Sequence, residues 1–115
     1  MTQKQMKNLI NSIFKEIQTT REAGQKEYAR KESNAFANFE RVGKNLELPR
    51  EEILLVYLLK HIDGICSYVK GHKSQREDVT GRITDAIVYL CLLWGMVGNK
   101  FPGKSKYYYN RLKHE

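Results

Sequence analysis

The sequence predicts an all-α protein, a compact four-helix bundle-like domain with a basic tail. Apolar residues recur at spacings of three and four in four segments, glycine or proline separates these segments, and no stretch shows the alternation of a strand. A chain of 115 residues is long enough for one modest core and short enough to gain from oligomerisation. We therefore expect one domain over residues 1–98 and a Tyr/Lys-rich tail over residues 99–115.

The first predicted helix runs from about Thr2 to Gly24, or on to Tyr28. Its apolar residues follow one helical face: Met6, Leu9, Ile10, Ile13, Phe14 and Ile17. The polar stretch 29–33 is expected to form a loop. Asn34 can then cap a short second helix that carries Phe36, Phe39 and Val42 and ends near Gly43.

The third predicted helix begins at Pro49, because proline suits the first turn and the glutamates at 51 and 52 suit the positive end of the helix dipole. It carries a run of apolar residues and ends at Gly71. The segment 74–77 has the spacing of a capping box and is expected to open the fourth helix, which ends near Gly95 or Gly98. Pro102 and Gly103 separate this helix from the tail.

The fourth predicted helix is apolar on nearly all sides over residues 86–97, so it must be covered by its own chain or by another copy. This predicts a homo-oligomer. A dozen apolar residues are too few to span a bilayer, and no signal peptide is visible, so we expect a soluble cytoplasmic protein without a membrane partner. Cys66 and Cys91 lie in apolar helices and are expected to be buried free thiols.

The formal net charge of +7 is uneven, since residues 99–115 hold five cations and one acid. A basic excess favours anionic partners such as nucleotides, nucleic acid or acidic membranes, without choosing among them. Tyr108 lies in a run of three tyrosines between Lys106 and Arg111, a pattern that can stack on a base while cations hold phosphate. We expect the tail to pack beside a ligand pocket; a solvated tail is the alternative.

Polar and aromatic residues gather on one face of each of the last two helices. Tyr57, Lys60 and His61 fall together on the third helix, and Arg82, Asp85 and Tyr89 follow one stripe of the fourth. The short connection makes these helices antiparallel neighbours, which can bring the two sets together. Cations that neutralise phosphate and aromatics that stack a base predict a nucleotide pocket, with Asn38 and Arg41 as further contributors.

Two simpler interpretations remain open, a solvated polar face and a structural salt bridge between Arg82 and Asp85.

Gly64 and Gly81 lie inside predicted helices, where each costs about 1 kcal/mol against alanine, so a close approach is expected at both. The three histidines have no metal-ligand spacing with the cysteines, no phosphate-binding glycine loop is present, and nothing marks an activated nucleophile. We therefore expect no metal, no cofactor and no catalytic residue.

Residues 25–97 resemble small phage proteins grouped as nucleotide-modification-associated domains. The resemblance rests on Ala-Phe-Ala-Asn-Phe at 35–39, Lys-His-Ile-Asp-Gly-Ile at 60–65 and Gly-Arg-Ile-Thr-Asp at 81–85. More distantly, the last helix is similar to the Glu-x-x-Asp-x-x-x-Tyr helix of MazG-like all-α NTP pyrophosphatases, in which acidic residues bind magnesium. Asp85 and Tyr89 match that pattern, but Arg82 replaces its glutamate. This exchange disfavours a divalent metal and favours direct contact with phosphate.

Three functions follow from the residues and the resemblance. The favoured one is a phage nucleotide-binding protein that sequesters a host immune signal of the cyclic-nucleotide or ADP-ribose type in the bacterial cytoplasm, without hydrolysing it. The first alternative is a magnesium-dependent nucleoside triphosphate pyrophosphohydrolase that uses Asp85 with Asp63 or Glu40. The second alternative is a nucleic-acid-binding accessory protein that uses the tail.

Overall fold

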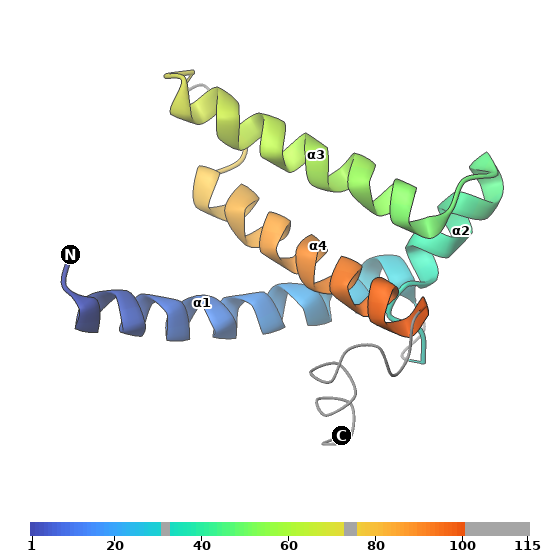
Figure 1. The fold of residues 1–115 in the computed structure, drawn as a ribbon, viewed down its shortest axis with the longest axis horizontal. Helices are drawn as coiled ribbons and strands as arrows, with labels where there is room; N and C mark the ends of the chain where they lie inside the picture. Colours follow the sequence, from blue (N-terminus) through green and yellow to red (C-terminus); the bar gives the residue numbers. More distant parts are fainter. Residues whose placement is uncertain (31–32, 73–75, 101–115) are drawn as a thin grey trace.

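The computed structural model describes residues 1–30, 33–72 and 76–100. These residues form four α-helices, α1 (Gln3–Gly24), α2 (Ala37–Leu46), α3 (Arg50–Val69) and α4 (Val79–Lys100), and a π-helical turn, η1 (Gln25–Ala29), that continues α1 (Figure 1). No strand occurs in these ranges. The all-α prediction is confirmed.

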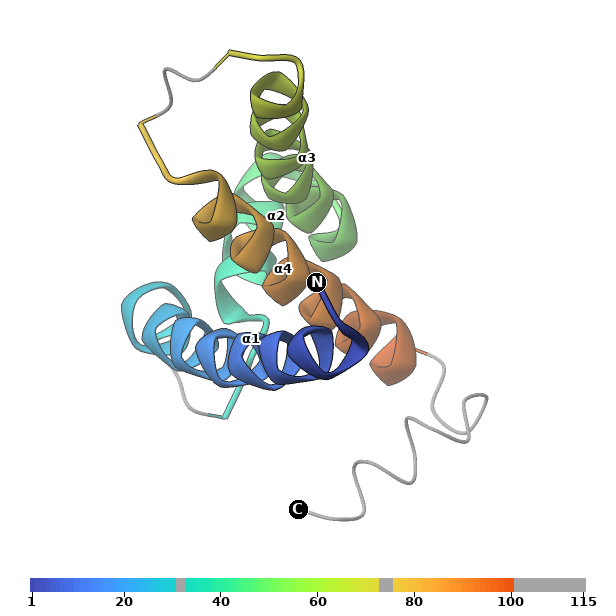
Figure 2. The same ribbon diagram turned by 90° about the vertical axis from the view of Figure 1, so that its left-hand side faces the viewer.

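The helices form an open arrangement. Helices α3 and α4 run antiparallel and lie side by side in both views, and α2 lies near the start of α3 and the end of α4 (Figures 1 and 2). Helix α1 converges on α4 at its own C-terminal end, whereas its first half diverges from the other helices. None of the residues of α1 is buried. The described part of the chain is therefore more open than the compact bundle that the sequence predicts.

Helix α1 starts and ends with defined backbone features. The hydroxyl of Thr2 accepts a hydrogen bond from the Gln5 N–H (3.1 Å), and the Gln5 side chain accepts one from the Thr2 N–H (2.8 Å), which completes a capping box. The π-helical turn after Gly24 ends at Arg30, whose φ of 65° is left-handed. The two predicted limits of this helix thus each have a counterpart: Gly24 is the last residue of α1, and Tyr28 lies in the π-helical turn.

Helix α2 begins and ends later than the sequence predicts. The Asn34 side chain accepts a hydrogen bond from the Phe36 N–H (3.0 Å) and shapes the turn before the helix, but it does not cap it. The helix also continues three residues beyond Gly43, which is buried. A Cβ atom at Gly43 would lie 2.5 Å from the carbonyl oxygen of Leu48, so this glycine permits a close backbone contact and is not a C-cap.

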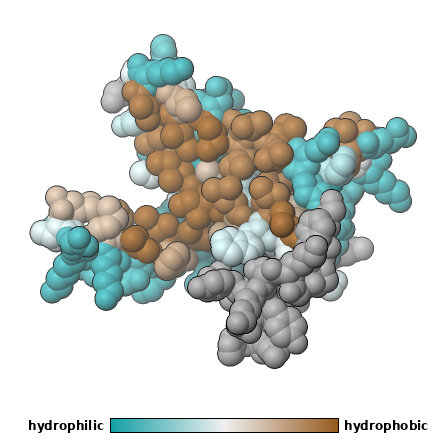
Figure 3. Space-filling view, viewed as in Figure 1, coloured by the Kyte–Doolittle hydropathy of each residue, from teal (hydrophilic) through white to brown (hydrophobic). Residues whose placement is uncertain are grey.

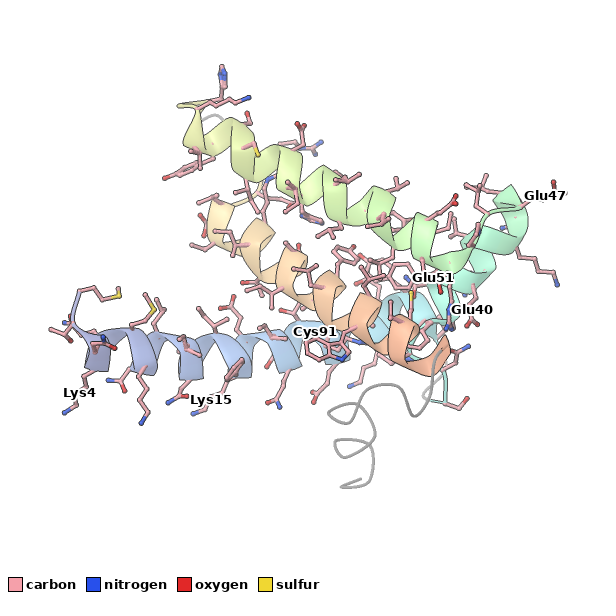
Figure 4. All side chains as sticks on the ribbon, viewed as in Figure 1. Lys4, Lys15, Glu40, Glu47, Glu51 and Cys91 are labelled. Carbon is pink, nitrogen blue, oxygen red and sulfur yellow. The ribbon has the colours of Figure 1, made fainter. Side chains whose placement is uncertain are left out.

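Helix α3 follows Pro49, as predicted, and Gly71 follows its end with a left-handed φ of 101°. Arg50 organises the corner between α2 and α3. Its guanidinium lies 2.8 Å from Glu40 and 3.7 Å from Glu51, and both acids lie at this corner in Figure 4. This corner fixes α2 against α3 and therefore fixes the side chains that α2 offers to the interior.

Helix α4 begins at Val79, five residues beyond the start of the predicted capping box. Ser74 lies outside the described residues, whereas residues 76–78 are described and not helical. Asp78 defines the start, because its carbonyl accepts from the Arg82 N–H (3.1 Å) and its carboxylate from the Thr80 hydroxyl.

The buried core is small and lies between α2, α3 and α4: Phe39, Ile53, Leu54, Val88, Leu92 and Met96. Cys66 and Cys91 are exposed, so the prediction of buried thiols was wrong. Both occur in apolar helices, but these helices are covered on one side only in the described chain. An apolar neighbourhood in the sequence is therefore a poor guide to burial here.

Much apolar surface remains open on α1, α3 and α4. Figure 3 shows apolar side chains gathered on the face viewed, over α3, α4 and the adjoining part of α1. The exposed apolar residues of these helices include Met6, Leu9, Ile10, Phe14, Leu55, Val56, Leu59, Ile62, Ile83, Leu90, Trp94 and Val97. We call these twelve residues the apolar face.

One helix in the described ranges, α4 over Val79–Gly98, is long and apolar enough to cross a membrane, with a mean hydropathy of 1.3. This stretch is longer than the dozen residues considered in the sequence. Core helices of soluble proteins pass the same test, 33% of the stretch is buried, and it packs along α3. The arrangement is compatible with a soluble protein.

Candidate functional site

A pocket of about 730 Å³ lies where the end of α1, η1, α2, α3 and α4 meet. Seven of the nine residues proposed from the sequence line it: Asn38, Arg41, Tyr57, Lys60, His61, Asp85 and Tyr89. The antiparallel pairing of α3 and α4 therefore does bring the two predicted sets of residues together. The pocket is the candidate functional site.

The other two proposed residues have different positions. Arg82 does not line the pocket, because its side chain lies across Gly64 of α3, where a Cβ atom would come within 2.5 Å of the guanidinium. The close neighbour at Gly64 is thus a side chain, whereas no atom of the described residues lies within 4 Å of a Cβ built at Gly81. Tyr108 lies outside the described residues.

The Arg82 guanidinium forms no ion pair with Asp85 in the described part of the chain, and its buried Nε has no hydrogen-bond partner there. The alternative interpretation of a structural salt bridge between these two residues is therefore wrong. Asp85 instead faces His61, with 3.8 Å between Asp85 Oδ2 and His61 Nδ1.

One wall of the pocket is aromatic. The rings of Tyr57 and Tyr89 are nearly parallel with centroids 6.2 Å apart, Phe39 meets both edge to face, and His61 lies 5.5 Å from the Tyr89 ring. Burial and the negative charge of Asp85 raise the pKa of Tyr89 to about 12. The Tyr89 hydroxyl therefore stays uncharged at neutral pH, and the rings of this wall can contact a planar ligand.

Three cationic side chains reach the pocket, but two of them also bind the backbone. The Arg21 guanidinium donates to the carbonyl of Ala35 (3.1 Å), and the Arg41 guanidinium donates to the carbonyl of Tyr28 (2.8 Å). Burial lowers the pKa of Arg21. Lys60 makes no hydrogen bond or ion pair with the described residues and is exposed, which leaves its ammonium group available for an anion.

Three acidic side chains balance these cations: Glu27, Glu77 and Asp85. The pocket is therefore not the cationic site that the sequence suggests. Glu77 and Asp85 lie close to His61, and one ligand-capable atom from each of the three falls within 4.8 Å of the others. Since two carboxylates repel phosphate, an anion in this pocket is best held near one of the three cations, above all Lys60, or by a bridging metal ion.

Four titratable lining residues escaped the sequence reasoning: Arg21, Glu27, Tyr28 and Glu77. Three of them lie at the end of α1 and in η1, where the apolar repeat has ended, and Glu77 lies in the connection before α4. Glu27 carries a negative charge that raises the pKa of Tyr28, with smaller contributions from burial, a hydrogen bond to Glu27 and the charge of Asp85. A pocket built from a helix end and a connection leaves no periodic signal in the sequence.

The acidic partners expected for Asp85 do not reach the pocket. Asp63 is exposed on α3 and does not line it, and Glu40 is bound to Arg50 at the α2–α3 corner.

Comparison of the chain with protein-family models, curated proteins and solved structures gave no match.

Proposed function

We propose that this protein binds a nucleotide in the pocket between η1, α2, α3 and α4 and sequesters it without hydrolysing it. The observation that carries the proposal is the combination of a stacked tyrosine wall with an unpaired lysine in one cavity of about 730 Å³. A cavity of this size accommodates a small ligand. The immune-signal class of nucleotide, cyclic or ADP-ribose-like, is suggested by the phage resemblance alone.

Each half of a nucleotide has a complementary wall. Tyr28, Tyr57 and Tyr89 offer aromatic faces to a base, and the contact of a base with an aromatic ring is worth about 1–3 kcal/mol. Lys60 offers a strongly hydrated point charge to a phosphate. Asn38 adds an amide that can donate to or accept from a base or ribose.

The test of this proposal separates capture from turnover. Purified protein is incubated with ATP, ADP-ribose and a cyclic dinucleotide, washed, and denatured, and the released molecules are analysed by mass spectrometry. We expect at least one of them to be retained and returned intact. Retention of none, or release of products alone, would contradict the proposal.

Lys60→Ala sharpens this test. Removal of one charge-assisted phosphate contact costs about 1.5–3 kcal/mol, or roughly 10- to 100-fold in affinity. Lys70→Ala is the matched control, because Lys70 is exposed at the far end of α3 and does not line the pocket. Equal affinities of the two variants in calorimetry would exclude Lys60 as a phosphate contact.

A pyrophosphohydrolase is the second candidate, and one observation favours it. The cluster of His61, Glu77 and Asp85 places two carboxylates and an imidazole in the pocket, which is a set of groups able to hold a cation beside a phosphate chain. Release of pyrophosphate from ATP in the mass-spectrometric assay would select this candidate. The nucleic-acid alternative depends on the tail, of which residues 99–100 belong to α4 and residues 101–115 lie outside the described residues.

We also propose that the protein works as a homo-oligomer in which a second copy covers the apolar face. Twelve exposed apolar side chains supply a large part of the roughly 20 residues that each partner contributes to an interface of standard size. Helix α1 needs such a partner most, because an amphipathic helix with no buried residue gains little from tertiary packing. Lys4 and Lys15 project from the side of α1 that points away from α3 and α4 (Figure 4), which leaves its apolar side free of these charges.

Light scattering coupled to gel filtration tests the oligomer. We expect a mass above that of one 13.5 kDa chain at micromolar concentration. Val56→Glu with Leu59→Glu places two charges on exposed positions of α3 and should dissociate the assembly without unfolding the chain, whereas Lys15→Glu should not. A clean monomer for the unmodified protein would refute the proposal.

A further inference from the structure

The nine-tenths-buried imidazole of His61 has a free nitrogen. The side chain is only 10% exposed, and its Nδ1 atom is inaccessible to solvent. This atom has no hydrogen-bond partner in the described residues. The nearest acid, Asp85, lies 3.8 Å away, which is too far for a hydrogen bond. A buried polar atom left unpaired in this way destabilises the folded chain unless something binds it.

The surroundings of this nitrogen supply further ligand atoms. Glu77 is exposed and approaches from the connection before α4, Asp85 is half-buried on α4, and His61 comes from α3. One ligand-capable atom from each lies within 4.8 Å of the other two. Ligands of a tetrahedral ion with bonds of about 2.0–2.1 Å lie roughly 3.3 Å apart, so rotation of the Glu77 side chain and a small closure would complete the site.

We propose that His61, Glu77 and Asp85 bind a divalent transition-metal ion, with zinc as the best match. One imidazole nitrogen with two carboxylate oxygens suits zinc or manganese, whereas magnesium prefers oxygen ligands and keeps most of its waters. Three protein ligands leave the fourth position of a tetrahedral ion open, and the cluster lines the pocket, so that position faces the cavity.

The ion also accounts for the acids in the pocket. Without it, Glu77 and Asp85 repel the phosphate of the nucleotide that we propose as ligand; with it, the local charge is neutral and the phosphate can occupy the open coordination position. This part of the inference rests on the proposed function, whereas binding of the metal alone does not.

The test uses the full chain, stripped of metal by a chelator, in a Cys66→Ser, Cys91→Ser background, because both thiols are exposed and thiolates are zinc ligands in general. Calorimetry with zinc chloride measures affinity and stoichiometry, and visible absorption of cobalt(II) reports the ligand set. We expect saturable binding of one ion per chain that millimolar magnesium does not displace.

Glu77→Gln is the decisive variant, because the exposed position makes unfolding improbable as an explanation. We expect it to weaken zinc binding at least 10-fold, while Asp63→Asn, an equal change of charge at an exposed position of α3 outside the cluster, binds as the parent does. Absence of saturable binding, or equal affinities of the two variants, would overturn the site. Zinc binding without nucleotide binding would overturn only the proposed function, and nucleotide binding without zinc binding would overturn only the metal site.

Discussion

Replacement of Gly43 by alanine should destabilise the protein, although alanine is the better helix former. Gly43 lies inside α2, and its backbone is helical, so propensity alone predicts a gain of about 0.5–1 kcal/mol. The new methyl group, however, would lie 2.5 Å from the carbonyl oxygen of Leu48, where carbon and oxygen atoms ordinarily approach to about 3.3–3.6 Å.

The clash involves backbone and cannot be relieved by turning a side chain. To separate the two atoms, the Leu48 segment must move, which strains the hydrogen bond from the Leu48 N–H to the Gly43 carbonyl (2.9 Å). Overpacking costs about 1–3 kcal/mol and a strained hydrogen bond about 1 kcal/mol. After subtraction of the propensity gain, we expect a net loss of about 2 kcal/mol, or roughly 6–12 °C in Tm.

Thermal unfolding monitored by circular dichroism measures this loss. Gly81→Ala is the matched control, since it makes the same substitution in α4 with no atom within 4 Å of the new methyl group, and it should raise Tm by a few degrees. The two variants are thus expected to shift Tm in opposite directions. If Gly43→Ala raised Tm as Gly81→Ala does, the close backbone contact at the α2–α3 corner would not exist.

Three further predictions concern the site. The pKa of Tyr89 is raised to about 12 in the folded state, above its unfolded value near 10, so the hydroxyl proton contributes stability below about pH 10 that is lost toward pH 12. Tyr89→Phe should therefore flatten the decline of the urea-unfolding free energy between about pH 10 and pH 12. Equal declines in the variant and the unmodified protein would contradict this prediction. Arg82→Ala should leave nucleotide affinity within about twofold, or roughly 0.4 kcal/mol, because Arg82 lies outside the pocket; a loss as large as that of Lys60→Ala in calorimetry would show that it contacts the ligand. Deletion of residues 104–115 should raise the ligand dissociation rate in stopped flow and leave the oligomer intact. An unchanged rate would show that the tail does not contribute to ligand binding.

The sequence predicted the elements better than their ends. The apolar repeat from Met6 to Ile17 located α1, and Pro49 located the start of α3, because these signals are local. Gly43 was interpreted as a helix end because glycine is common there, while the structure uses it for a contact with Leu48, a residue outside the helix. Such a contact is a property of the corner and has no trace in the spacing of residues.

The candidate site was predictable where it lies on α3 and α4. Antiparallel helices joined by a short connection face each other at matched levels, so His61 and Asp85 could be paired from their distances to the turn. The distances to the turn do not determine how α4 is rotated about its own axis. That rotation places the Arg82 side chain against Gly64 and not in the pocket. Glu77 was missed for a different reason, since it precedes the helix whose periodicity was used.

The π-helical turn makes the place of Tyr28 in the pocket depend on chain length. A hydrogen bond from each N–H to the carbonyl five residues back inserts one residue relative to an α-helix, and the insertion lies beside Tyr28, where helix α1 meets the pocket. Deletion of Gln25 or Lys26 would restore the α-helical register and rotate the rest of the turn by about 100°. Tyr28 and Glu27 would then turn away from the cavity, while the apolar stripe of α1 kept its place.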